Sequence, residues 1–511
     1  MTRSSACVIG LDCGTGGARA LVSDLSGRVL GQATAEYATH FPRPGWAEQS
    51  PEDWWTAAVA AIRGAVAAAG VSPTDVVAIS ADGTSSTLVA LDDGLRPIGP
   101  AILWMDNRAS AQARRMTATE DPALRRCRAG VSSEWMLPRI LWLAERRPAE
   151  FERTRWFVEM ADYLTLRLSG RLTLGHNQAT NRWFFDGRAG GWPKAFFAKI
   201  GLAGIDERFP AEVLPLGSPV GPLGREAQEA TGLSATTRVV CGGTDAYVAM
   251  PGLDVCRPGK TALITGSSHL ILCQTDTPRE IAGLFGPHRD CVVPGLFVYE
   301  GGQVSSLSIV KWWHDHFAAA SRSGDVYGEM MRAAAEVRIG ADGLVALDFW
   351  QGNRNPYTDY DLQGAIWGLT LRHTPAHMLR ALVESIAFGT RNILAALTGA
   401  GVPVTDMTVC GGAARSRFLL QMHADTTGIP IVVPTVTEAT AFGSAIVAAV
   451  GAGVYAGLAE AADAMVSIAE TIDPDPTTRE AYEEGFDTYR ATHAALAPLM
   501  HRMAERRVAR H

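Results

Sequence analysis

The sequence has no excess of positive charge. It contains 46 lysine and arginine residues against 53 aspartate and glutamate residues, which gives a formal net charge of −7. A protein that binds nucleic acid needs a basic footprint for the phosphate backbone. We therefore expect no nucleic acid as a partner. An anionic ligand would have to be held by backbone amides or by a bound cation.

The eight cysteines include no C-x-x-C pair. Their spacing suggests neither a zinc site nor a disulfide framework. Several lie in apolar runs, where a reduced thiol behaves as a small hydrophobic side chain. This usage predicts a reducing, cytoplasmic location.

Long apolar runs are scarce as well. The first, at residues 7–11, is too short for a signal peptide and is interrupted by Asp12. Residues 439–462 are rich in alanine and glycine but have few large apolar side chains. A membrane span needs about 20 predominantly apolar residues. We therefore expect a buried helix at 439–462 and no membrane partner.

What the sequence does contain is a repeated order of strands and glycine turns. An apolar run at residues 7–11 leads through a glycine turn into a second run at 18–22. The same order returns at residues 261–265 and 269–273, on either side of Gly266. Such self-similarity predicts a duplicated α/β domain.

The 511 residues are enough for two to four domains. Proline and glycine cluster at residues 251–258, between two structured runs, as is typical of a boundary. We expect one domain at residues 1–252 and a second at 253–511.

Helix signals are clear in a few places. Residues 51–69 should form a helix, with Ser50 as N-cap, Pro51 in the first turn and Gly70 as the stop signal. Further helices are expected at 375–397, at 416–427 and in the alanine-rich segment after 439. The strands expected between them are 407–410 and 431–433.

The first glycine turn carries groups that suit a phosphate. Its glycine amides can face an anion, and Thr15 adds a hydroxyl donor. Asp12 could hold a magnesium ion through water. A tight β-hairpin is the plainer explanation, and the turn matches neither a P-loop nor a Rossmann fingerprint. The candidate nucleotide-binding residues here are Asp12, Gly14, Thr15, Gly16, Gly17 and Arg19.

Two turns in the second half offer similar chemistry. Gly266 and Ser267 supply a glycine amide and a hydroxyl, which suggests that both halves hold one polyphosphate. Gly411 and Gly412 open a helix at Ser416, and small residues there would let an adenine ring lie against the backbone. Taken alone, the second of these motifs is better explained as a plain strand-to-helix turn.

Asp245 is the candidate catalytic residue. It stands on a glycine turn after the apolar run at 238–240. A carboxylate in such a place can accept the proton of a sugar hydroxyl as the oxygen attacks phosphorus. The structural alternative is an aspartate that caps the next helix.

Two further segments carry polar groups that suit sugar hydroxyls. One contains Asp106 and Arg108, and the other contains Glu300 and Gln303. The alternatives are structural, because an Asp–Arg pair can be an ion pair and Glu300 could begin a helix.

In this order the motifs resemble the FGGY family of carbohydrate kinases along nearly the whole chain. The two phosphate turns, the Gly243-Thr-Asp245 motif and Gly411-Gly412-Ala413 carry the resemblance. The stretch Gly352-Asn-Arg-Asn-Pro356 looks like the second-domain signature. The resemblance implies two actin-like or ribonuclease-H-like domains with ATP in the cleft between them. It also implies magnesium, transfer of the γ-phosphate to a sugar hydroxyl, Asp245 as general base, and adenosine contacts at Gly412 and Ser416.

Within the family, the segments around Asp106 and Glu300 look most like those of ribulokinases. Xylulokinases usually show Gln-Met-His-Gly where this chain has Asp-Gly-Thr-Ser at 82–85, and the Arg-Glu pair of glycerol kinases is absent. The chain departs from the family at Ser267, where Thr is usual, and at Asn353, where Glu is common. The substrate-side residues that the resemblance implies are Gly83, Thr84, Asp106, Arg108, Asp245, Glu300 and Gln303.

We therefore predict an ATP- and Mg²⁺-dependent kinase that phosphorylates a terminal hydroxyl of a ketose, in particular ribulose. A homodimer is compatible with the sequence. The alternatives are a kinase for xylulose, a tetrulose, a heptulose or a pentitol, and a non-catalytic, actin-like protein that binds nucleotide and senses a sugar.

Overall fold

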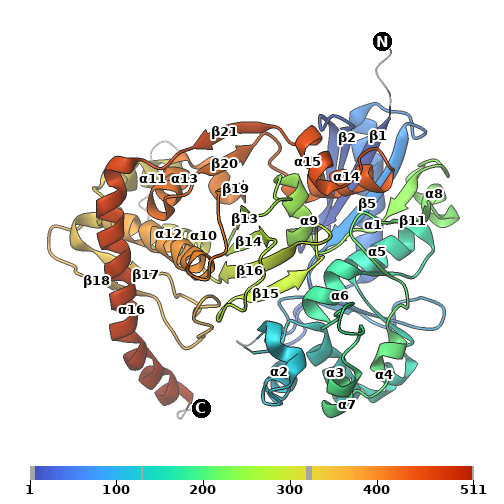
Figure 1. Ribbon diagram of the computed structural model, residues 1–511, viewed down its shortest axis with the longest axis horizontal. Coiled ribbons are helices and arrows are strands. Elements are labelled where there is room, and N and C mark those ends of the chain that lie inside the picture. Colours follow the sequence, from blue (N-terminus) through green and yellow to red (C-terminus); the bar gives the residue numbers. More distant parts are fainter. Residues whose placement is uncertain (1–5, 128–129, 318–324, 509–511) are drawn as a thin grey trace. The chain divides into compact units, whose positions relative to one another are not determined.

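A computed structural model describes residues 6–127, 130–317 and 325–508 (Figure 1). The chain divides into two compact units. The first contains Met1–Arg257, Gly286–Val298 and Glu438–Ser467, and the second contains Pro258–Phe285, Tyr299–Thr437 and Ile468–His511. The chain therefore passes between the units several times, and a segment near the C-terminus completes the first one.

The first unit is built on a six-stranded sheet. Its strands follow the order β11-β12-β5-β1-β2-β3. Strands β12, β5 and β1 are parallel, whereas β1, β2 and β3 form an antiparallel meander. The bounds are β1 (Cys7–Cys13), β2 (Gly17–Asp24), β3 (Val29–Glu36), β5 (Val76–Gly83), β11 (Pro219–Pro222) and β12 (Arg238–Val240).

Helices cover both faces of this sheet. Successive side chains of a strand point to opposite faces, so each strand contacts a helix on either side. Ile9 and Leu11 of β1 share a hydrophobic core with Trp54 of α1 (Pro51–Ala69). Gly10 faces the other way, where α14 (Ala439–Gly451) lies so close that an added Cβ would be 1.8 Å from the Ala441 carbonyl oxygen. Helix α9 (Asp245–Gly252) packs beside α14. Asp12 lies two residues after Gly10 on the same strand, so its side chain points to the face that α14 covers.

A second large sheet has the order β15-β16-β14-β13-β19-β20-β21. In the second unit, β13 and β14 form an antiparallel hairpin, and β13, β19 and β20 are parallel. The bounds are β13 (Lys260–Thr265), β14 (His269–Thr275), β15 (Phe285–Arg289), β16 (Phe297–Gln303), β19 (Asp406–Gly411), β20 (Ile431–Pro434) and β21 (Ile468–Ile472). Helices of this unit include α10 (Leu307–Phe317), α12 (Pro375–Gly399), α13 (Arg417–Thr427) and α16 (Arg479–Val508).

The duplication predicted from the glycine turns is confirmed. The order β2-β1-β5-β12 in one sheet corresponds to β14-β13-β19-β20 in the other, with the same pattern of one antiparallel and two parallel pairings. Each unit therefore has a hairpin whose glycine turn lies at the carboxyl end of the central parallel strand.

Several local predictions are confirmed. Helix α1 begins at Pro51 after Ser50 and ends at Gly70, which has a φ of 64°. Helix α14 is largely buried, and no described helix is long and apolar enough to cross a membrane. All eight cysteines are buried and unbridged. Strand β5 runs from Val76 through Asp82 to Gly83, because it pairs in parallel with all of β1.

A small sheet with the order β4-β7-β6-β8 positions part of the candidate site. It consists of β4 (Glu48–Gln49), β6 (Leu88–Leu91), β7 (Ala101–Ile102) and β8 (Trp156–Glu159). The turn at 84–87 leads from β5 of the large sheet into β6, and the loop at 103–108 follows β7. Both loops therefore start from fixed strand ends.

Candidate active site

Three aspartates of the first unit form a group of neighbouring carboxyls. Asp12 of β1 and Asp82 of β5 are register partners on adjacent parallel strands, so their side chains lie on the same face. Asp245 is the first residue of α9, and its charge acts on Asp82. Asp12 is 8% exposed and Asp82 is fully buried.

Burial determines how this group is charged. It raises the pKa of the Asp82 carboxyl well above its usual value, and the charges of Asp12 and Asp245 raise it further. Burial also raises the pKa of Asp12, but a hydrogen bond with Asp82 and the charge of Arg19 act in the opposite direction. Asp82 is therefore the more readily protonated carboxyl of the pair, and Asp12 is the one whose charged form Arg19 favours.

Asp82 is a residue that the sequence reasoning missed. Its Oδ2 accepts a hydrogen bond of 2.6 Å from the Ser444 hydroxyl of α14. A signal was available, because Asp82 ends an apolar run just as Asp12 does. The two strands adjoin in the sheet, however, and that neighbourhood is not visible in the sequence.

The first glycine turn is held by side chains that contact its carbonyl groups. Tyr37 donates its hydroxyl to the Gly14 carbonyl. Gln49 Nε2 lies 2.7 Å from the Thr15 carbonyl oxygen, and Trp104 Nε1 donates to the Thr15 hydroxyl at 3.0 Å. Gly16 is exposed, and an added Cβ there would meet no atom within 4 Å. The turn is thus anchored on one side and open on the other.

Two further residues of this turn have structural constraints. Gly17 cannot carry a side chain, because a Cβ would be 2.7 Å from the Ala35 carbonyl oxygen of β3. Arg19 Nη1 lies 3.3 Å from Asp12 Oδ2 and 2.9 Å from Glu438 Oε2. Arg19 is therefore placed beside the candidate magnesium ligand, where it compensates the charge of two carboxylates.

The Asp245 turn is fixed to β5. The Gly83 amide donates to the Gly243 carbonyl at 3.2 Å, and Gly83 and Thr244 form a parallel bridge. Asn177 Oδ1 accepts a hydrogen bond of 3.0 Å from the Thr244 amide. Asp245 itself is half-buried at the start of α9, and its Oδ1 accepts from the Ala246 amide at 2.7 Å. Its carboxylate is thus oriented by the helix it begins.

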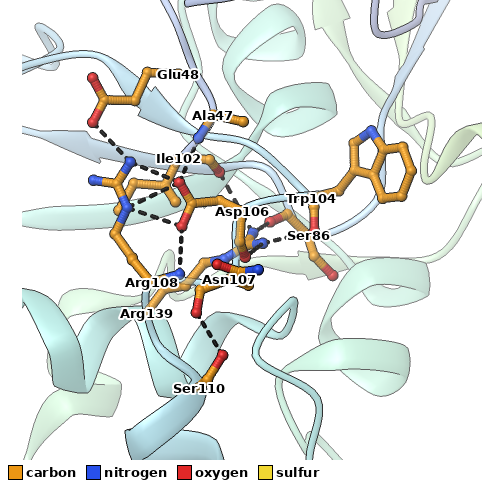
Figure 2. A network of polar contacts seen from close by, with 10 residues as sticks. All are labelled: Ala47, Glu48, Ser86, Ile102, Trp104, Asp106, Asn107, Arg108, Ser110 and Arg139. Atoms are coloured by element: carbon orange, nitrogen blue, oxygen red, sulfur yellow. Dashed lines mark hydrogen bonds and ion pairs between the residues drawn. The ribbon is translucent and has the colours of Figure 1, made fainter. Parts of the chain in front are cut away.

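The segment with Asp106 and Arg108 forms a buried network (Figure 2). Asp106 accepts hydrogen bonds from the Ala47 amide at 2.7 Å and from Arg108 Nη2 at 2.7 Å. Arg108 also donates to Glu48 at 2.8 Å, and its guanidinium lies 3.7 Å from the ring centroid of Trp46. The Arg108 side chain is 3% exposed, and the Asp106 side chain is not exposed.

The two side chains therefore form the ion pair that the sequence left open as an alternative. A direct contact of either with a sugar stays a prediction that this geometry does not support. Their evident effect is to fix the loop at 103–108, because a buried pair is stable only with its hydrogen bonds satisfied. Trp104 and Asn107 are the exposed residues of this loop, and Trp104 has 38% of its surface accessible.

The turn at 84–87 is also mostly internal. Gly83 lacks room for a side chain, since a Cβ would be 2.9 Å from Met160 Cγ. Thr84 is 4% exposed, and its hydroxyl lies 2.6 Å from that of Thr87. Ser85 is the half-buried residue of the turn. Gly83 and Thr84 stay predicted substrate residues, with backbone atoms as the groups they can offer.

In the second unit, the two predicted nucleotide turns are adjacent. Thr265 and Gly411 are register partners at the ends of β13 and β19. Thr265 donates its hydroxyl to the Cys410 carbonyl at 2.6 Å and accepts from the Ala413 amide at 3.0 Å. Gly411 has a φ of 88°, and a Cβ there would be 1.9 Å from the Thr265 carbonyl oxygen. Glycine is therefore required at position 411, where the ends of β13 and β19 approach each other closely.

Ser267 and Ser416 complete this pair of turns. The Ser267 carbonyl accepts from the Ser306 amide at 2.9 Å and from the Ser308 hydroxyl at 2.8 Å. Ser416 caps α13 by accepting from the Leu419 amide at 3.4 Å. The structure therefore brings Gly266, Ser267, Gly411, Gly412 and Ser416 together at one end of the second unit's sheet.

Glu300 and Gln303 both end up in polar networks of the second unit. Arg354 donates to Glu300 at 2.8 Å, and Glu300 is 2% exposed. Gln303 donates to Asp348 at 2.9 Å and accepts from Thr390 at 2.8 Å. A sugar contact by Gln303 stays a prediction, which its internal partners do not favour. Asn355 Oδ1 accepts from the Gly302 amide at 2.8 Å, so the predicted second-domain signature holds β16.

A pair of buried histidines lies beside the second turn. The rings of His269 and His423 are 5.4 Å apart. Burial lowers the pKa of His269 well below its usual value and lowers that of His423 as well. The folded protein therefore keeps both rings neutral at a pH where the unfolded chain, with a usual pKa of about 6.5, takes up protons.

We expect the free energy of unfolding to fall as the pH drops through about 6.5, by up to about 1.4 kcal/mol per pH unit for each histidine. Melting temperatures at pH 7.5 and 5.5 test this. The variant H423M should lose less stability on acidification than the wild type, whereas H40N, at an exposed position, should behave like the wild type. Equal acid sensitivity of H423M and wild type would contradict the expectation.

No group of three or more histidine, cysteine, aspartate or glutamate residues suited to a metal occurs in the described part of the chain. A cation near Asp12 would need water and phosphate oxygens to complete its coordination. Magnesium is usually bound in this way, through one or two carboxylates and substrate phosphates.

The family models match both units in order. The FGGY N-terminal domain model covers residues 7–252, and the C-terminal domain model covers residues 261–452. The chain belongs to the FGGY family of carbohydrate kinases. It is thus a sugar kinase, and the FGGY fold is the two-unit α/β architecture described above.

Individual FGGY relatives are similar over most of their length. A protein named ribulokinase from Anoxybacillus flavithermus is 31% identical, over 95% of this chain and 94% of that protein. One of the same name from Mycolicibacterium smegmatis is 34% identical, over 88% and 86%. The crystal structure of xylulose kinase from Rhodospirillum rubrum has a TM-score of 0.88 and 28% identity, over 97% of this chain and all of that one.

Proposed function

We propose that this FGGY kinase transfers the γ-phosphate of ATP to a terminal hydroxyl of ribulose, with Asp245 as the general base. The observation that carries the proposal is the position of Asp245, a half-buried carboxylate beside the Asp12–Asp82 pair. Support for ribulose comes from the ribulokinase relatives at about 30% identity.

The residues of the first glycine turn fit a phosphate and magnesium. Gly16 leaves open space on the turn, and Asp12 is the carboxyl of its pair whose charged form the neighbouring Arg19 favours. Asp12 would hold Mg²⁺ through water, and the amides of residues 14–17 would face phosphate oxygens. Bound Mg²⁺·ATP supplies the γ-phosphoryl group and offsets the charge that develops on its oxygens.

Asp245 acts on the sugar. Its carboxylate accepts the proton of the terminal hydroxyl, while that oxygen forms a bond to phosphorus and the bond from phosphorus to the ADP oxygen breaks. The Ala246 amide and the start of α9 orient the carboxylate. Hydrogen bonds from the Gly83 amide and to Asn177 keep its turn on β5.

Xylulose is the second candidate, because the solved xylulose kinase of Rhodospirillum rubrum matches 97% of the chain. A panel of D-ribulose, L-ribulose, D-xylulose, a tetrulose, a heptulose and a pentitol separates the candidates. We expect ADP release with one of the ribuloses to exceed release with D-xylulose at least about tenfold in kcat/KM, which is about 1.4 kcal/mol of transition-state binding.

The product of the best sugar should carry phosphate on its terminal carbon, as ³¹P–¹H NMR would show. Faster turnover of D-xylulose would overturn the assignment to ribulose and leave the kinase reaction in place. ATP turnover that no sugar stimulates would overturn the assignment to this panel altogether.

A further inference from the structure

The two loops on the sugar-facing side of the first unit meet at one buried arginine. Arg139 of α3 (Met136–Arg146) has no exposed surface. Its Nη1 donates to the Ser86 carbonyl, and its Nη2 donates to the Trp104 carbonyl at 2.9 Å and to the Asp106 carbonyl at 3.2 Å. Figure 2 shows this guanidinium between the two loops.

The partners of Arg139 are unusual for a buried cation. Within the described residues, the Arg139 guanidinium donates to backbone carbonyl groups and to no carboxylate. Burial lowers the pKa of Arg139 to about 10, so it stays charged at neutral pH. Burying a charge without a direct ion pair is costly, and the carbonyl groups of the two loops and of β7 compensate it only if those segments stay in place.

Both backbone groups of Ser86, its amide and its carbonyl, are held by buried side chains. Its carbonyl accepts from Arg139, and its amide donates to Glu159 Oε2 at 2.6 Å. The other carboxylate oxygen of Glu159 accepts from Trp183 Nε1 at 2.6 Å. Ser86 has a φ of 59°, a left-handed conformation that costs a non-glycine residue about 1–2 kcal/mol. A cation and a carboxylate therefore hold a strained residue in place.

The accessible side chains of both loops adjoin these fixed points. Ser85 precedes Ser86 and is half-buried, and Trp104 is 38% exposed. Trp104 also donates to the Thr15 hydroxyl of the first glycine turn. Moving the Ser86 or Trp104 backbone would thus shift these accessible side chains.

We propose that Arg139 is a positioning residue for sugar recognition, which fixes the turn at 84–87 against the loop at 103–108 by holding Ser86 in its left-handed conformation. The inference rests on the proposed function, because the bridge between Gly83 and Thr244 places the start of the turn at 84–87 beside the proposed base Asp245. Arg139 contacts no substrate itself. Its loss raises the KM for the sugar much more than the KM for ATP.

The variant R139M keeps the length of the side chain and removes its donors. We expect the KM for D-ribulose to rise roughly 10- to 100-fold, because small displacements of positioning groups have effects of that size. The KM for ATP should change less than about twofold, and R139K should lie between R139M and the wild type.

A rescue variant separates positioning from general stability. Glycine adopts a positive φ without strain, so S86G in the R139M background should restore sugar affinity at least about threefold. The matched control is L95G, because Leu95 has a φ of 61° in another turn of the same unit. R139M/L95G relieves a positive φ elsewhere in the unit and should not recover sugar affinity. Equal KM values for R139M/S86G and R139M/L95G would overturn the proposal, as would parallel changes in both KM values.

Amide hydrogen exchange tests, without any turnover, whether Arg139 fixes the two loops. Peptides that cover residues 84–90 and 103–109 should exchange faster in R139K than in the wild type, while the rest of the first unit stays unchanged. Unchanged exchange at both loops would overturn the proposal even if R139M fails to fold. If the wild type phosphorylates no sugar of the panel, the proposed function fails, and this exchange experiment still decides whether Arg139 fixes the loops.

Discussion

Replacing Asp245 by asparagine should lower kcat with D-ribulose roughly 10²- to 10⁴-fold, the usual effect of removing a general base. Asparagine has nearly the same shape and can still accept the 2.7 Å hydrogen bond from the Ala246 amide. It cannot take a proton from the sugar hydroxyl at neutral pH. Because the fold of the turn is kept, the KM for ATP should change little.

The matched control for this experiment is D93N. Asp93 is an exposed carboxylate of the same unit, so its amide variant should keep wild-type kcat. A ribulose-dependent kcat of D245N within about threefold of the wild type would remove Asp245 from the role of base, since a threefold change corresponds to less than about 1 kcal/mol. Equal losses in D93N and D245N would point to a general effect of charge.

The second large effect is expected at Gly443. Helix α14 crosses α9 so closely that a Cβ on Gly443 would be 1.9 Å from the Val248 carbonyl oxygen. Likewise, a Cβ on Gly252 of α9 would be 2.2 Å from the Ala439 carbonyl oxygen of α14. These are backbone contacts, which cannot be relieved by turning a side chain.

The variant G443A should therefore lose roughly 3 kcal/mol or more of unfolding free energy, at the upper end for overpacking. It should also lose turnover, because Val248 lies one turn after Asp245. The control is G399A, at an exposed helix position where a Cβ meets nothing within 4 Å, which should gain up to about 1 kcal/mol from helix propensity. Calorimetry of both variants gives the comparison, and a G443A protein as stable as G399A would contradict the close crossing.

The predictions that succeeded were those set by short stretches of sequence. Helix α1 has its start and stop signals within 21 residues, from Ser50 to Gly70. The glycine turns at Gly14 and Gly266 could be recognised because strand, turn and strand follow one another directly. The duplicated sheets followed from the same local order.

The residues that were missed depend on pairings distant in the sequence. Asp82 becomes a partner of Asp12 through strand register, and Ser444, 362 residues further on, completes its environment. Arg139 lies in a helix without any motif, and its importance follows from carbonyl groups of two loops. No local pattern shows the pairing of Asp82 with Asp12 or the position of Arg139 between the two loops.

Asp106 and Arg108 show a third kind of limit. Their residue types suit a sugar and an internal ion pair equally well, and the sequence left both open. The choice depends on Glu48 and Trp46, which approach Arg108 from a segment about 60 residues earlier in the chain. Buried charges need partners, and those partners are fixed only by the fold.

The central claim is that Asp245 activates a ribulose hydroxyl in an FGGY kinase. The most direct measurement is ADP release at saturating ATP, with and without ribulose, for the wild type and D245N side by side. We expect strong stimulation of the wild type by the sugar and a D245N rate close to the sugar-independent level. Equal stimulation of both proteins, or no stimulation of the wild type by either enantiomer of ribulose, would contradict it.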